Sequence, residues 1–397
     1  MPEESNRPAG VVAIHATAEL RLQGGHRWVY ESEIASVDGT ARAGDVVEVV
    51  TQTGRGLGQG LYSPHSKIRV RLLTGADEPV TDGMWSSRLE AAITRRVSTI
   101  TDTTAYRVVH ADGDFVPGLI VDRYGDTLVM QTLTVGMERR KEFLADLLLP
   151  LTGATAVYLR NDVTARALEG LAPERRFLRG NGPTLIEIQE GPARFRVDIE
   201  RGQKTGWFCD QRENRLAVAA MSQGKDVLDA FCHTGGFGIH TALAGARSVA
   251  GLDASRDATE QARQHARLNQ VEASCDLRQA DAFDAFRKLG RSRKRFDVVI
   301  LDPPAFAKQR GVKQTALEGY QHLHRLAIPL IRLGGTLVTC SCSHHVSDKE
   351  LEMTVMDSAR RSRRAICVTE RRGPAADHPI IETMPETRYL SCLVFKV

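Results

Sequence analysis

Val227-Leu-Asp-Ala-Phe-Cys-His-Thr-Gly-Gly-Phe-Gly-Ile239 is an apolar run that breaks into glycines and is followed by helix-like sequence. Gly235, Gly236 and Gly238 allow a tight turn and a close approach of the backbone to a ligand. A second apolar run ends at Asp253, and an acid at that place can bind ribose hydroxyls. This order of elements predicts a nucleotide-cofactor loop in a doubly wound α/β sheet.

Acidic residues recur at the ends of successive predicted strands. Asp229 ends the first strand, Asp253 the second, Asp281 follows the third, and Asp302-Pro303-Pro304 ends the fourth. Because the carboxyl ends of parallel strands meet at one edge, these acids should line one crevice. A dehydrogenase would not need Asp-Pro-Pro. The alternative for each acid is a helix N-cap, which suits Asp253 because helix-like sequence follows it.

Two thiols lie further along, where a predicted buried strand runs into a polar turn at the same edge. If the strand persisted, Cys340 and Cys342 would share one face, but Cys342 lies closer to the turn and hence to the crevice. A thiolate can add to C6 of a pyrimidine and make C5 nucleophilic enough to take a methyl group from a sulfonium donor. A base then removes the C5 proton and the thiol leaves. The pattern therefore indicates 5-methylpyrimidine chemistry.

The neighbours of Cys342 bear on its reactivity. A nucleophilic thiol needs a lowered pKa or a basic neighbour, which His344 or His345 could provide. We interpret Cys340 as a buried, inert thiol. A zinc site is a poor alternative, because Cys340, Cys342, His344 and His345 are too close in sequence to surround a tetrahedral metal. No metal site is predicted.

Length and composition limit the class of protein. A chain of 397 residues with 42% hydrophobic residues predicts two or three globular domains. No apolar run approaches the roughly 18 residues of a membrane span, so we expect a soluble, cytoplasmic protein. The seven cysteines are irregularly spaced, which favours free thiols in a reducing compartment.

The pattern of elements divides the chain into three predicted domains, residues 1–78, 79–189 and 190–397. The first reads as a small β barrel, in which Lys67, Arg69 and Arg71 form one basic strand face that suits RNA. A solvated edge strand protected by charge is the alternative. The second reads as α+β, with a helix from Trp85 to Ile100, and strands alternate with helices in the third.

Basic residues are clustered, although the formal net charge is only +4. Each cluster alone could be a solvated surface, but together they favour an anionic partner. The clusters are Arg287, Lys288, Arg291, Arg293, Lys294 and Arg295; Arg360, Arg361, Arg363 and Arg364; and Arg175, Arg176 and Arg179.

Several motifs together resemble bacterial 23S ribosomal RNA cytosine-C5 methyltransferases of the large subunit methyltransferase I family. They are Gly202-Gln-Lys-Thr-Gly-Trp-Phe-Cys-Asp-Gln-Arg212, Asp229-Ala-Phe-Cys-His-Thr-Gly-Gly-Phe-Gly238, Asp302-Pro-Pro-Ala-Phe306, Ser341-Cys-Ser343 and Ala376-Asp-His-Pro379. The amino-terminal stretches 22–30 and 60–64 look like that family's PUA-type domain. The resemblance implies a PUA domain, a small central α+β domain and a Rossmann-like class I methyltransferase domain.

The same resemblance implies the cofactor, the substrate and the site. The cofactor would be S-adenosylmethionine, and the substrate 23S ribosomal RNA or a large-subunit precursor, with no membrane involved and a homodimer allowed. Cys342 would be the nucleophile, and Asp302 would be a catalytic acid near the target cytosine base and the methyl donor. The residues implied to bind the cofactor are Phe208, Asp210, Arg212, Asp229, Phe231, Thr234, Gly235, Gly236, Gly238, Asp253, Asp281, Asp302 and Pro303.

One departure and two rival functions remain open. Related two-cysteine enzymes carry a Cys after the Pro of this motif, whereas Ala305 follows Pro304 here. Another base must therefore remove the C5 proton, and Asp302 and His344 are the candidates. Asp-Pro-Pro-x-Phe also resembles the motif with which exocyclic-amine methyltransferases bind an amino group of adenine or guanine. Under either function, Phe306 could stack on a flipped base or belong to the core. A non-catalytic RNA-binding assembly factor is the second alternative.

Overall fold

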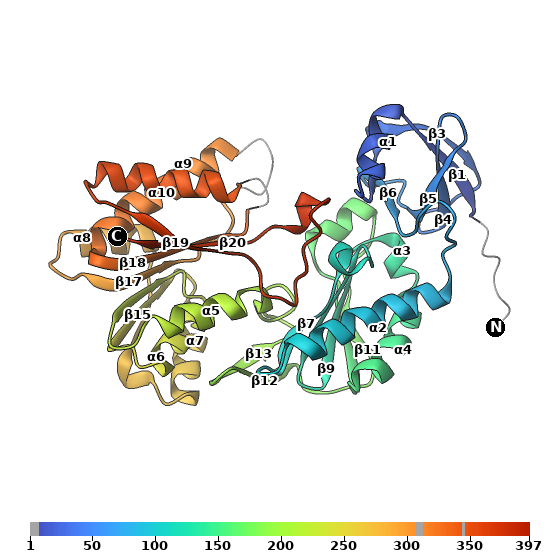
Figure 1. Ribbon diagram of the computed structural model, residues 1–397. Helices are drawn as coiled ribbons and strands as arrows, with labels where there is room; N and C mark the ends of the chain where they lie inside the picture. Colours follow the sequence, from blue (N-terminus) through green and yellow to red (C-terminus); the bar gives the residue numbers. More distant parts are fainter. Residues whose placement is uncertain (1–7, 307–312, 344–345) are drawn as a thin grey trace. The chain divides into compact units, whose positions relative to one another are not determined.

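A computed structural model describes residues 8–306, 313–343 and 346–397 (Figure 1). His344 and His345, predicted as helpers of Cys342, lie outside the described residues. The chain forms two compact units. The first unit comprises Met1–Ile188, Val197–Cys209 and Ala376–Thr387, and the second unit comprises Gln189–Arg196, Asp210–Ala375 and Arg388–Val397.

An amino-terminal sheet in the first unit has the strand order β2-β6-β5-β4-β1-β3. Its elements are β1 (Gly10–Ile14), α1 (Ala16–Gln23), β2 (Trp28–Tyr30), β3 (Ile34–Gly39), β4 (Val46–Thr51), β5 (Gly56–Tyr62) and β6 (Ile68–Leu72). Val70 and Leu72 of β6 are buried in its core, as their alternation with arginines predicts.

The edge-strand interpretation of β6 is wrong, because β6 lies between β2 and β5 and hydrogen bonds to both. Its basic face is also partly neutralised. Arg71 pairs with Glu169 at 3.1 Å, and Arg69 pairs with Glu31. The interior position keeps the strand paired on both sides, so its charges are not needed to block edge-to-edge association.

The second sheet of the first unit has the order β11-β10-β9-β8-β7. Its elements are α2 (Asp82–Thr99), β7 (Ala105–His110), β8 (Leu119–Tyr124), β9 (Thr127–Thr132), α3 (Val135–Glu138), α4 (Lys141–Thr152), β10 (Ala156–Arg160) and β11 (Arg175–Arg179). Thr81 caps α2, because its hydroxyl accepts a hydrogen bond from the Met84 amide. Trp85 and Leu89 of α2 pack into the core of this sheet.

The arginines of β11 are an exception to the prediction of an anionic partner. Arg175 pairs with Asp162, Arg176 with Glu174, and Arg179 with Asp146 and Glu142. This cluster is therefore neutralised within the chain and offers little charge to an outside anion.

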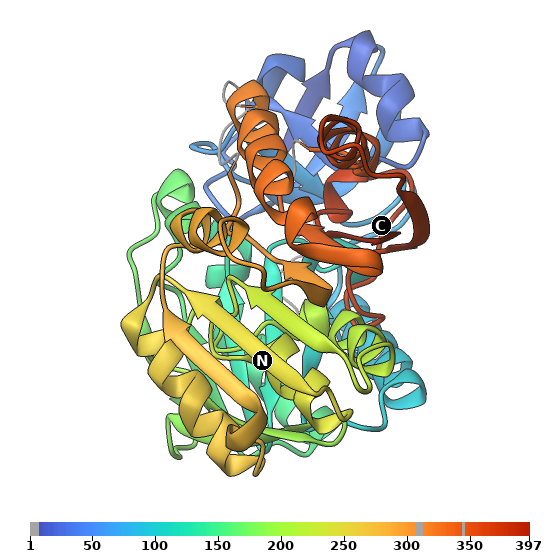
Figure 2. The same cartoon turned by 90° about the vertical axis from the view of Figure 1, so that its left-hand side faces the viewer.

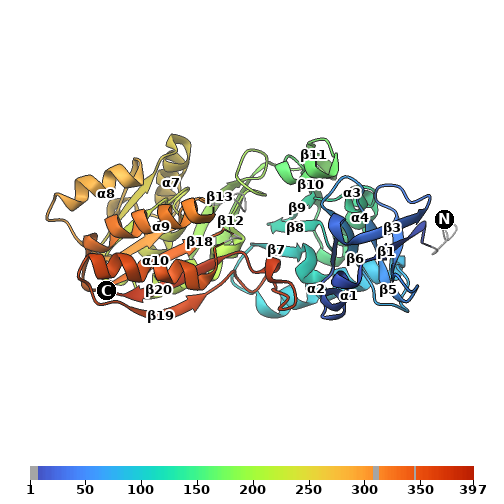
Figure 3. The ribbon, with the colours of Figure 1, turned by 90° about the horizontal axis from the view of Figure 1, so that it is seen from above.

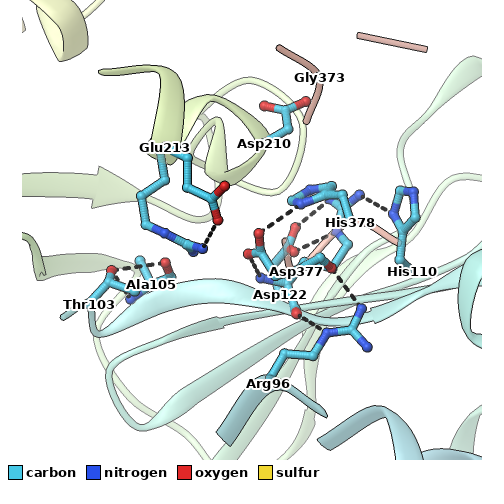
Figure 4. A network of polar contacts seen from close by, with 12 residues as sticks. Arg96, Thr103, Ala105, His110, Asp122, Asp210, Glu213, Gly373, Asp377 and His378 are labelled. Atoms are coloured by element: carbon cyan, nitrogen blue, oxygen red, sulfur yellow. Dashed lines mark hydrogen bonds and ion pairs between the residues drawn. The ribbon is translucent and has the colours of Figure 1, made fainter. Parts of the chain in front are cut away.

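Segment Ala376–Thr387, which contains the Ala-Asp-His-Pro motif, is held by buried charges of the first unit (Figure 4). Arg96 forms a fork with Asp114 at 2.6 and 2.7 Å and donates to the Asp377 carbonyl at 2.7 Å. The Asp377 carboxylate accepts from the Arg107 amide at 2.8 Å, and the His378 ring lies 4.9 Å from that of His110. The motif thus anchors a chain segment that is distant in sequence.

The second unit is built on a sheet in the order β16-β15-β14-β17-β18-β20-β19. Its strands are β14 (Asp226–Ala230), β15 (Ser248–Asp253), β16 (Cys275–Gln279), β17 (Phe296–Leu301), β18 (Ile331–Ser341), β19 (Cys367–Arg372) and β20 (Ser391–Lys396). The strands from β16 to β18 are parallel. β20 is antiparallel to both of its neighbours, β18 and β19, so β19 runs in the same direction as β18. A hairpin of β12 (Leu185–Glu190) and β13 (Ala193–Asp198) precedes it.

Helices cover both faces of this sheet, as the doubly wound prediction requires (Figures 1 and 2). They are α5 (Arg212–Ala220), α6 (Gly236–Leu243), α7 (Arg256–Leu268), α8 (Ala282–Gly290), α9 (Lys313–Ala327) and α10 (Asp348–Arg361). One core joins α8, α9 and α10 to the sheet, and another joins α5 and α6 to its other face. β14 pairs with β15 on one side and β17 on the other, which makes its carboxyl end the switch point where such sheets bind ligands.

His324 of α9 gives a testable dependence of stability on pH. It is fully buried between the hydroxyls of Thr339 and Thr354, at 2.9 and 3.1 Å, and burial lowers its pKa to about 3. The folded state thus holds neutral histidine, whereas the unfolded chain takes up a proton below pH ~6.5. Its contribution is complete above pH ~6.5 and falls toward pH ~3, by about 1.4 kcal/mol per pH unit.

Chemical denaturation between pH 7 and 5 checks this expectation. His324→Gln should be less stable than wild type at pH 7 but should lose stability less steeply as the pH falls. His322→Gln, on the same helix and only half-buried, is the matched control and should keep most of the wild-type slope. Equal slopes for wild type and His324→Gln would contradict the assignment.

Candidate cofactor and catalytic site

The glycine-rich turn between β14 and α6 has the strained, left-handed backbone that its sequence predicts. Gly235 adopts φ +89°, and Phe231 and His233 adopt φ +64° and +48°. The His233 amide donates to Asp253 at 2.9 Å, and the Gly238 amide donates to Asp229 at 2.9 Å. The acids at the ends of β14 and β15 therefore hold the turn in place.

Asp229 has unusual electrostatics. Its side chain is buried, and one carboxylate oxygen accepts from Gly238 while the other has no hydrogen-bond partner among the described residues. Burial raises its pKa to about 8, and the nearby charges of Asp302 and Asp253 add to the shift. A buried polar atom without a protein partner is suited to contact a bound ligand.

The helix-cap alternative is wrong for Asp253 but describes Asp281. Ser255 caps α7, since its hydroxyl accepts from the Ala258 amide, and Asp253 instead accepts from His233. Asp281 is exposed and caps α8 by accepting from the Asp284 amide at 3.0 Å. The capping hydrogen bond is by itself a sufficient structural reason for an aspartate at position 281, although the same side chain could also contact a ligand.

His265 supports the turn, and the sequence did not single it out. It is buried in α7, its Nδ1 lies 2.8 Å from the Thr234 carbonyl, and its Nε2 lies 3.0 Å from the Arg196 amide. Burial lowers the pKa of His265, so it is neutral near pH 7. Nδ1–H then donates to Thr234 and Nε2 accepts from Arg196, which fixes the tautomer.

A buried cluster of charged and polar side chains lies next to the glycine-rich turn between β14 and α6. Glu190 forms a fork with Arg215 at 2.6 Å and accepts from His240 at 3.0 Å. These charges hold the pKa of Glu190 well below its usual range despite burial. A Cβ on Gly236 would lie 3.0 Å from Arg215, so the arginine also limits the room beside the turn. Sequence reasoning missed this cluster because its members are far apart in the chain.

Removing Glu190 should destabilise the second unit strongly. Glu190→Ala leaves Arg215 buried without its carboxylate partner, and breaking such a pair costs about 3–5 kcal/mol. Urea denaturation followed by circular dichroism measures the free energy of unfolding. Asp284→Ala, which breaks the exposed pair with Arg287, is the control and should have little effect. If both variants lost only a small and similar amount of unfolding free energy, the structural role of the Glu190 cluster would be refuted.

Asp302 directly follows β17, next to the switch point. Its carboxylate accepts from the Gln211 amide group at 3.1 Å, and Gln211 in turn accepts from Asn214 at 2.7 Å. Asp302 is half-buried, and Pro303 after it is buried. Gln211 and Asn214 come from the start of α5, so this helix orients the catalytic candidate. Neither residue was predicted to belong to the site.

The two cysteines of the β18 turn have different surroundings, as predicted. Cys340 is fully buried beside Cys392 of the neighbouring strand, and the contact with Cys392 and burial both raise the pKa of the Cys340 thiol. β18 ends at Ser341, so Cys342 lies beyond the strand and is half-buried. All seven cysteines lie within the described residues, and none of them forms a disulfide bond.

Tyr320 of α9 fixes the turn that carries Cys342. Its hydroxyl lies 2.8 Å from the Ser341 hydroxyl and 3.4 Å from that of Ser343. Burial raises the pKa of Tyr320 to about 12, and the nearby Cys342 and Asp302 charges contribute to the shift. β17 and β18 pair in register up to Leu301 and Thr339, so Asp302 and the turn that carries Cys342 follow the ends of neighbouring strands. Nothing in the local sequence around Tyr320 identifies it.

The remaining predicted residues are less closely grouped. Asp210 accepts from the Tyr389 hydroxyl at 2.7 Å, and the buried Arg212 lies 3.3 Å from Glu213. Phe208 belongs to the first unit, where Lys204 lies 4.4 Å from its ring centre. Phe306 contacts Tyr320 edge-on, with ring centres 4.8 Å apart, and packs against the core, which favours the core interpretation.

The turn fits a nucleoside sulfonium cofactor. Gly238 lies so close to Asp229 that a Cβ on this glycine would be 3.2 Å from the carboxylate oxygen. The other, buried oxygen of Asp229 has no hydrogen-bond partner among the described residues and could contact a polar or charged group of a ligand. Asp253, at the end of the next strand, is an acid suited to hydroxyl groups. The chemistry of these groups matches a ligand with a cationic end and a ribose.

Comparison with known proteins agrees with this geometry. A family model for S-adenosylmethionine-dependent methyltransferases matches residues 171–388, and one for PUA-like domains matches residues 12–75. A relative from Shewanella denitrificans, named ribosomal RNA large subunit methyltransferase I, is 38% identical over 385 residues, covering 96% of this chain and 97% of the relative. The chain belongs to this methyltransferase family. Its cofactor is S-adenosylmethionine.

Further relatives and solved structures extend the comparison of this methyltransferase. A protein of the same name from Alteromonas mediterranea is 36% identical and covers 97% of this chain and 98% of the relative. A structure from Streptococcus mutans, named as a SAM-dependent methyltransferase, has a TM-score of 0.84 at 19% identity and covers 98% of this chain and all of the other. A methyltransferase structure complexed with SAH has the same TM-score at 20% identity. These structures show the shared fold. No helix among the described residues of this methyltransferase is long and apolar enough to cross a membrane.

Proposed function

We propose that this methyltransferase modifies C5 of a cytosine in RNA of the large ribosomal subunit, with Cys342 as the nucleophile. The RNA class is supported by the names of the relatives and by the PUA-like match. The observation that carries the cytosine chemistry is the position of Cys342, one residue beyond the end of β18, because β18 pairs with β17, the strand that Asp302 directly follows. A methyltransferase acting on an exocyclic amine has no need for a thiol there. As ribosomal RNA is the substrate, the compartment is the bacterial cytoplasm.

The reaction follows from general pyrimidine chemistry and the chain's own groups. The Cys342 sulfur adds to C6 of the cytosine, and the electron pair released from the C5–C6 double bond makes C5 nucleophilic. S-Adenosylmethionine, when bound, supplies an electrophilic methyl group for C5. A base then takes the C5 proton, the C5–C6 double bond re-forms, and the Cys342–C6 bond breaks.

The structure suggests roles for two neighbours of Cys342. Tyr320 positions the turn through Ser341, so that the thiol stays at the edge of the sheet. Asp302, oriented by Gln211, is the described residue best suited to receive the C5 proton, since Ala305 occupies the place of the second cysteine of related enzymes. His344 remains the alternative base named by the sequence, outside the described residues. Homodimerisation also remains a prediction.

Nucleoside analysis tests the reaction class. Purified protein, labelled S-adenosylmethionine and unmodified 23S RNA are incubated, and the digested RNA is examined by mass spectrometry. We expect labelled 5-methylcytidine. Labelled N-methylated purine in its place would favour the exocyclic-amine alternative, and cofactor binding without transfer would favour the assembly-factor alternative.

A further inference from the structure

We call the side of the second unit's sheet where β17 and β18 end, next to Asp302 and Cys342, the catalytic edge. Two of the basic clusters of the sequence meet at the opposite side, where these strands begin. Residues 291–295 lead directly into β17, whose first residue is Phe296. Phe296 pairs in register with Ile331, the first residue of β18, and Arg364 after α10 donates to the Ile331 carbonyl at 3.0 Å. The segments around Arg293 and Arg363 therefore flank the same pair of strand starts.

The helices bring these segments together. α9 contacts both α8 and α10, and Figure 3 shows the three on one face of the sheet. Each runs from the catalytic edge toward the opposite edge, because each connects a strand's carboxyl end to the next strand's start. The carboxyl ends of α8 and α10, which carry the basic clusters, are therefore at the same edge. We call this surface the basic edge; it consists of Lys288, Arg291, Arg293, Lys294, Arg295, Arg361 and Arg363.

The acids near the basic edge are already engaged by other arginines. Asp226 and Asp297 bind Arg332, at 2.7 and 2.5 Å, and Asp226 also binds Arg247. In the flanking helices, Asp284 pairs with Arg287 and Asp357 with Arg360. Among the described residues, none forms an ion pair with a member of the basic edge. The contrast with β11, whose arginines are all paired, is clear.

We propose that the basic edge binds phosphate groups of the RNA substrate, as a second contact surface on the methyltransferase unit. All of its members are exposed except the half-buried Arg295, and most are arginines, whose planar guanidinium groups match phosphate oxygens. Excess positive charge without acidic partners attracts a polyanion and releases counterions on binding. The choice of RNA rather than an acidic protein rests on the proposed function.

The position of the basic edge has a consequence for the substrate. β17 has 6 residues, and at about 3.3 Å per residue the sheet separates the two edges by roughly 20 Å. RNA that contacts both edges must reach past the whole sheet. A folded RNA domain can do this, whereas a short oligonucleotide around the target cytosine cannot. The basic edge should thus affect binding of long RNA and leave the chemistry at the catalytic edge unchanged.

Salt-dependent RNA binding tests the proposal with a matched pair of triple variants. One variant combines Arg291→Ala, Arg293→Ala and Arg361→Ala. The control combines Arg263→Ala, Arg267→Ala and Arg278→Ala, which removes the same formal charge from α7 and β16 of the same unit. The probe is a fluorescent, folded fragment of 23S RNA, titrated with the full chain at several KCl concentrations. Thermal melting verifies that both variants are folded.

The basic-edge variant should bind the fragment roughly 10- to 100-fold more weakly near physiological salt, with the slope of log K against log salt reduced by about 2 to 3. The control should keep the wild-type slope. Equal losses in both variants, or none in either, would overturn the proposal. Unchanged RNA binding combined with a smaller assembly mass by light scattering would assign the edge to protein contacts instead.

Methyl transfer separates this proposal from the proposed function. On a short oligonucleotide around the modified cytosine, the basic-edge variant should match wild type, while on the long fragment its KM should rise at unchanged kcat. If the wild type makes no 5-methylcytidine, the proposed function fails, but the binding comparison still decides whether the basic edge contacts RNA.

Discussion

Cys342→Ala is expected to abolish methyl transfer to RNA. Without the thiol, C6 receives no nucleophile and C5 stays too electron-poor to attack a sulfonium methyl group. The loss should be at least about 10⁴-fold in kcat, in line with removal of covalent nucleophiles elsewhere. Transfer of label from S-adenosylmethionine to 23S RNA measures this, and calorimetric binding of the cofactor should be nearly unchanged.

Cys340→Ala is the matched control, two residues away in the same strand region. Cys340 is fully buried beside Cys392, so its removal should lower stability by about 1 kcal/mol and leave the chemistry intact. RNA that contains 5-fluorocytidine gives a second readout, because C5 then carries fluorine in place of the proton that a base must remove, so the Cys342–C6 bond cannot break and the adduct is trapped. The trapped band should form with wild type and Cys340→Ala only. A band with Cys342→Ala would refute Cys342 as the nucleophile.

The features of this site that could be predicted from the sequence are those that depend on local backbone structure. Glycines, strand ends and the place where β18 stops are local properties, so Gly235, Asp229 and Asp302 could be placed from spacing alone. Cys342 was separated from Cys340 by the same reasoning, since β18 ends at Ser341 and the later thiol leaves the sheet. Short, charged strands were missed, as in β11, because their arginine-rich sequence lacks apolar alternation.

The supporting side chains could not be predicted because they come from distant segments. Gln211 reaches Asp302 across 91 positions of sequence, and Glu190 reaches His240 across 50. Tyr320 and His265 look like ordinary residues on the buried faces of amphipathic helices. Only the packing of α9 and α7 against the sheet shows that their polar atoms hold the turn that carries Cys342 and the glycine-rich turn after β14.

Binding of S-adenosylmethionine is expected to release a proton from Asp229. In the structure burial raises the Asp229 pKa to about 8, so the carboxyl group is mostly protonated at pH 7. The cofactor carries positive charge at its sulfonium and amino groups, and a cation near the free Asp229 oxygen would favour the carboxylate. Affinity should therefore rise with pH, by up to about tenfold per unit, and level off above pH ~8.

Calorimetry at pH 7 in two buffers of different ionisation enthalpy measures the released proton directly. Asp229→Asn can still accept from the Gly238 amide but cannot ionise, so it should keep the turn, bind the cofactor about 10- to 100-fold more weakly, and release no proton. Asp284→Asn, on the exposed surface of α8, should behave as wild type. If wild-type binding released no proton and Asp229→Asn bound equally well, Asp229 would serve only to hold Gly238. The pH dependence thus distinguishes a carboxylate that meets the cofactor's charge from one that only shapes the turn.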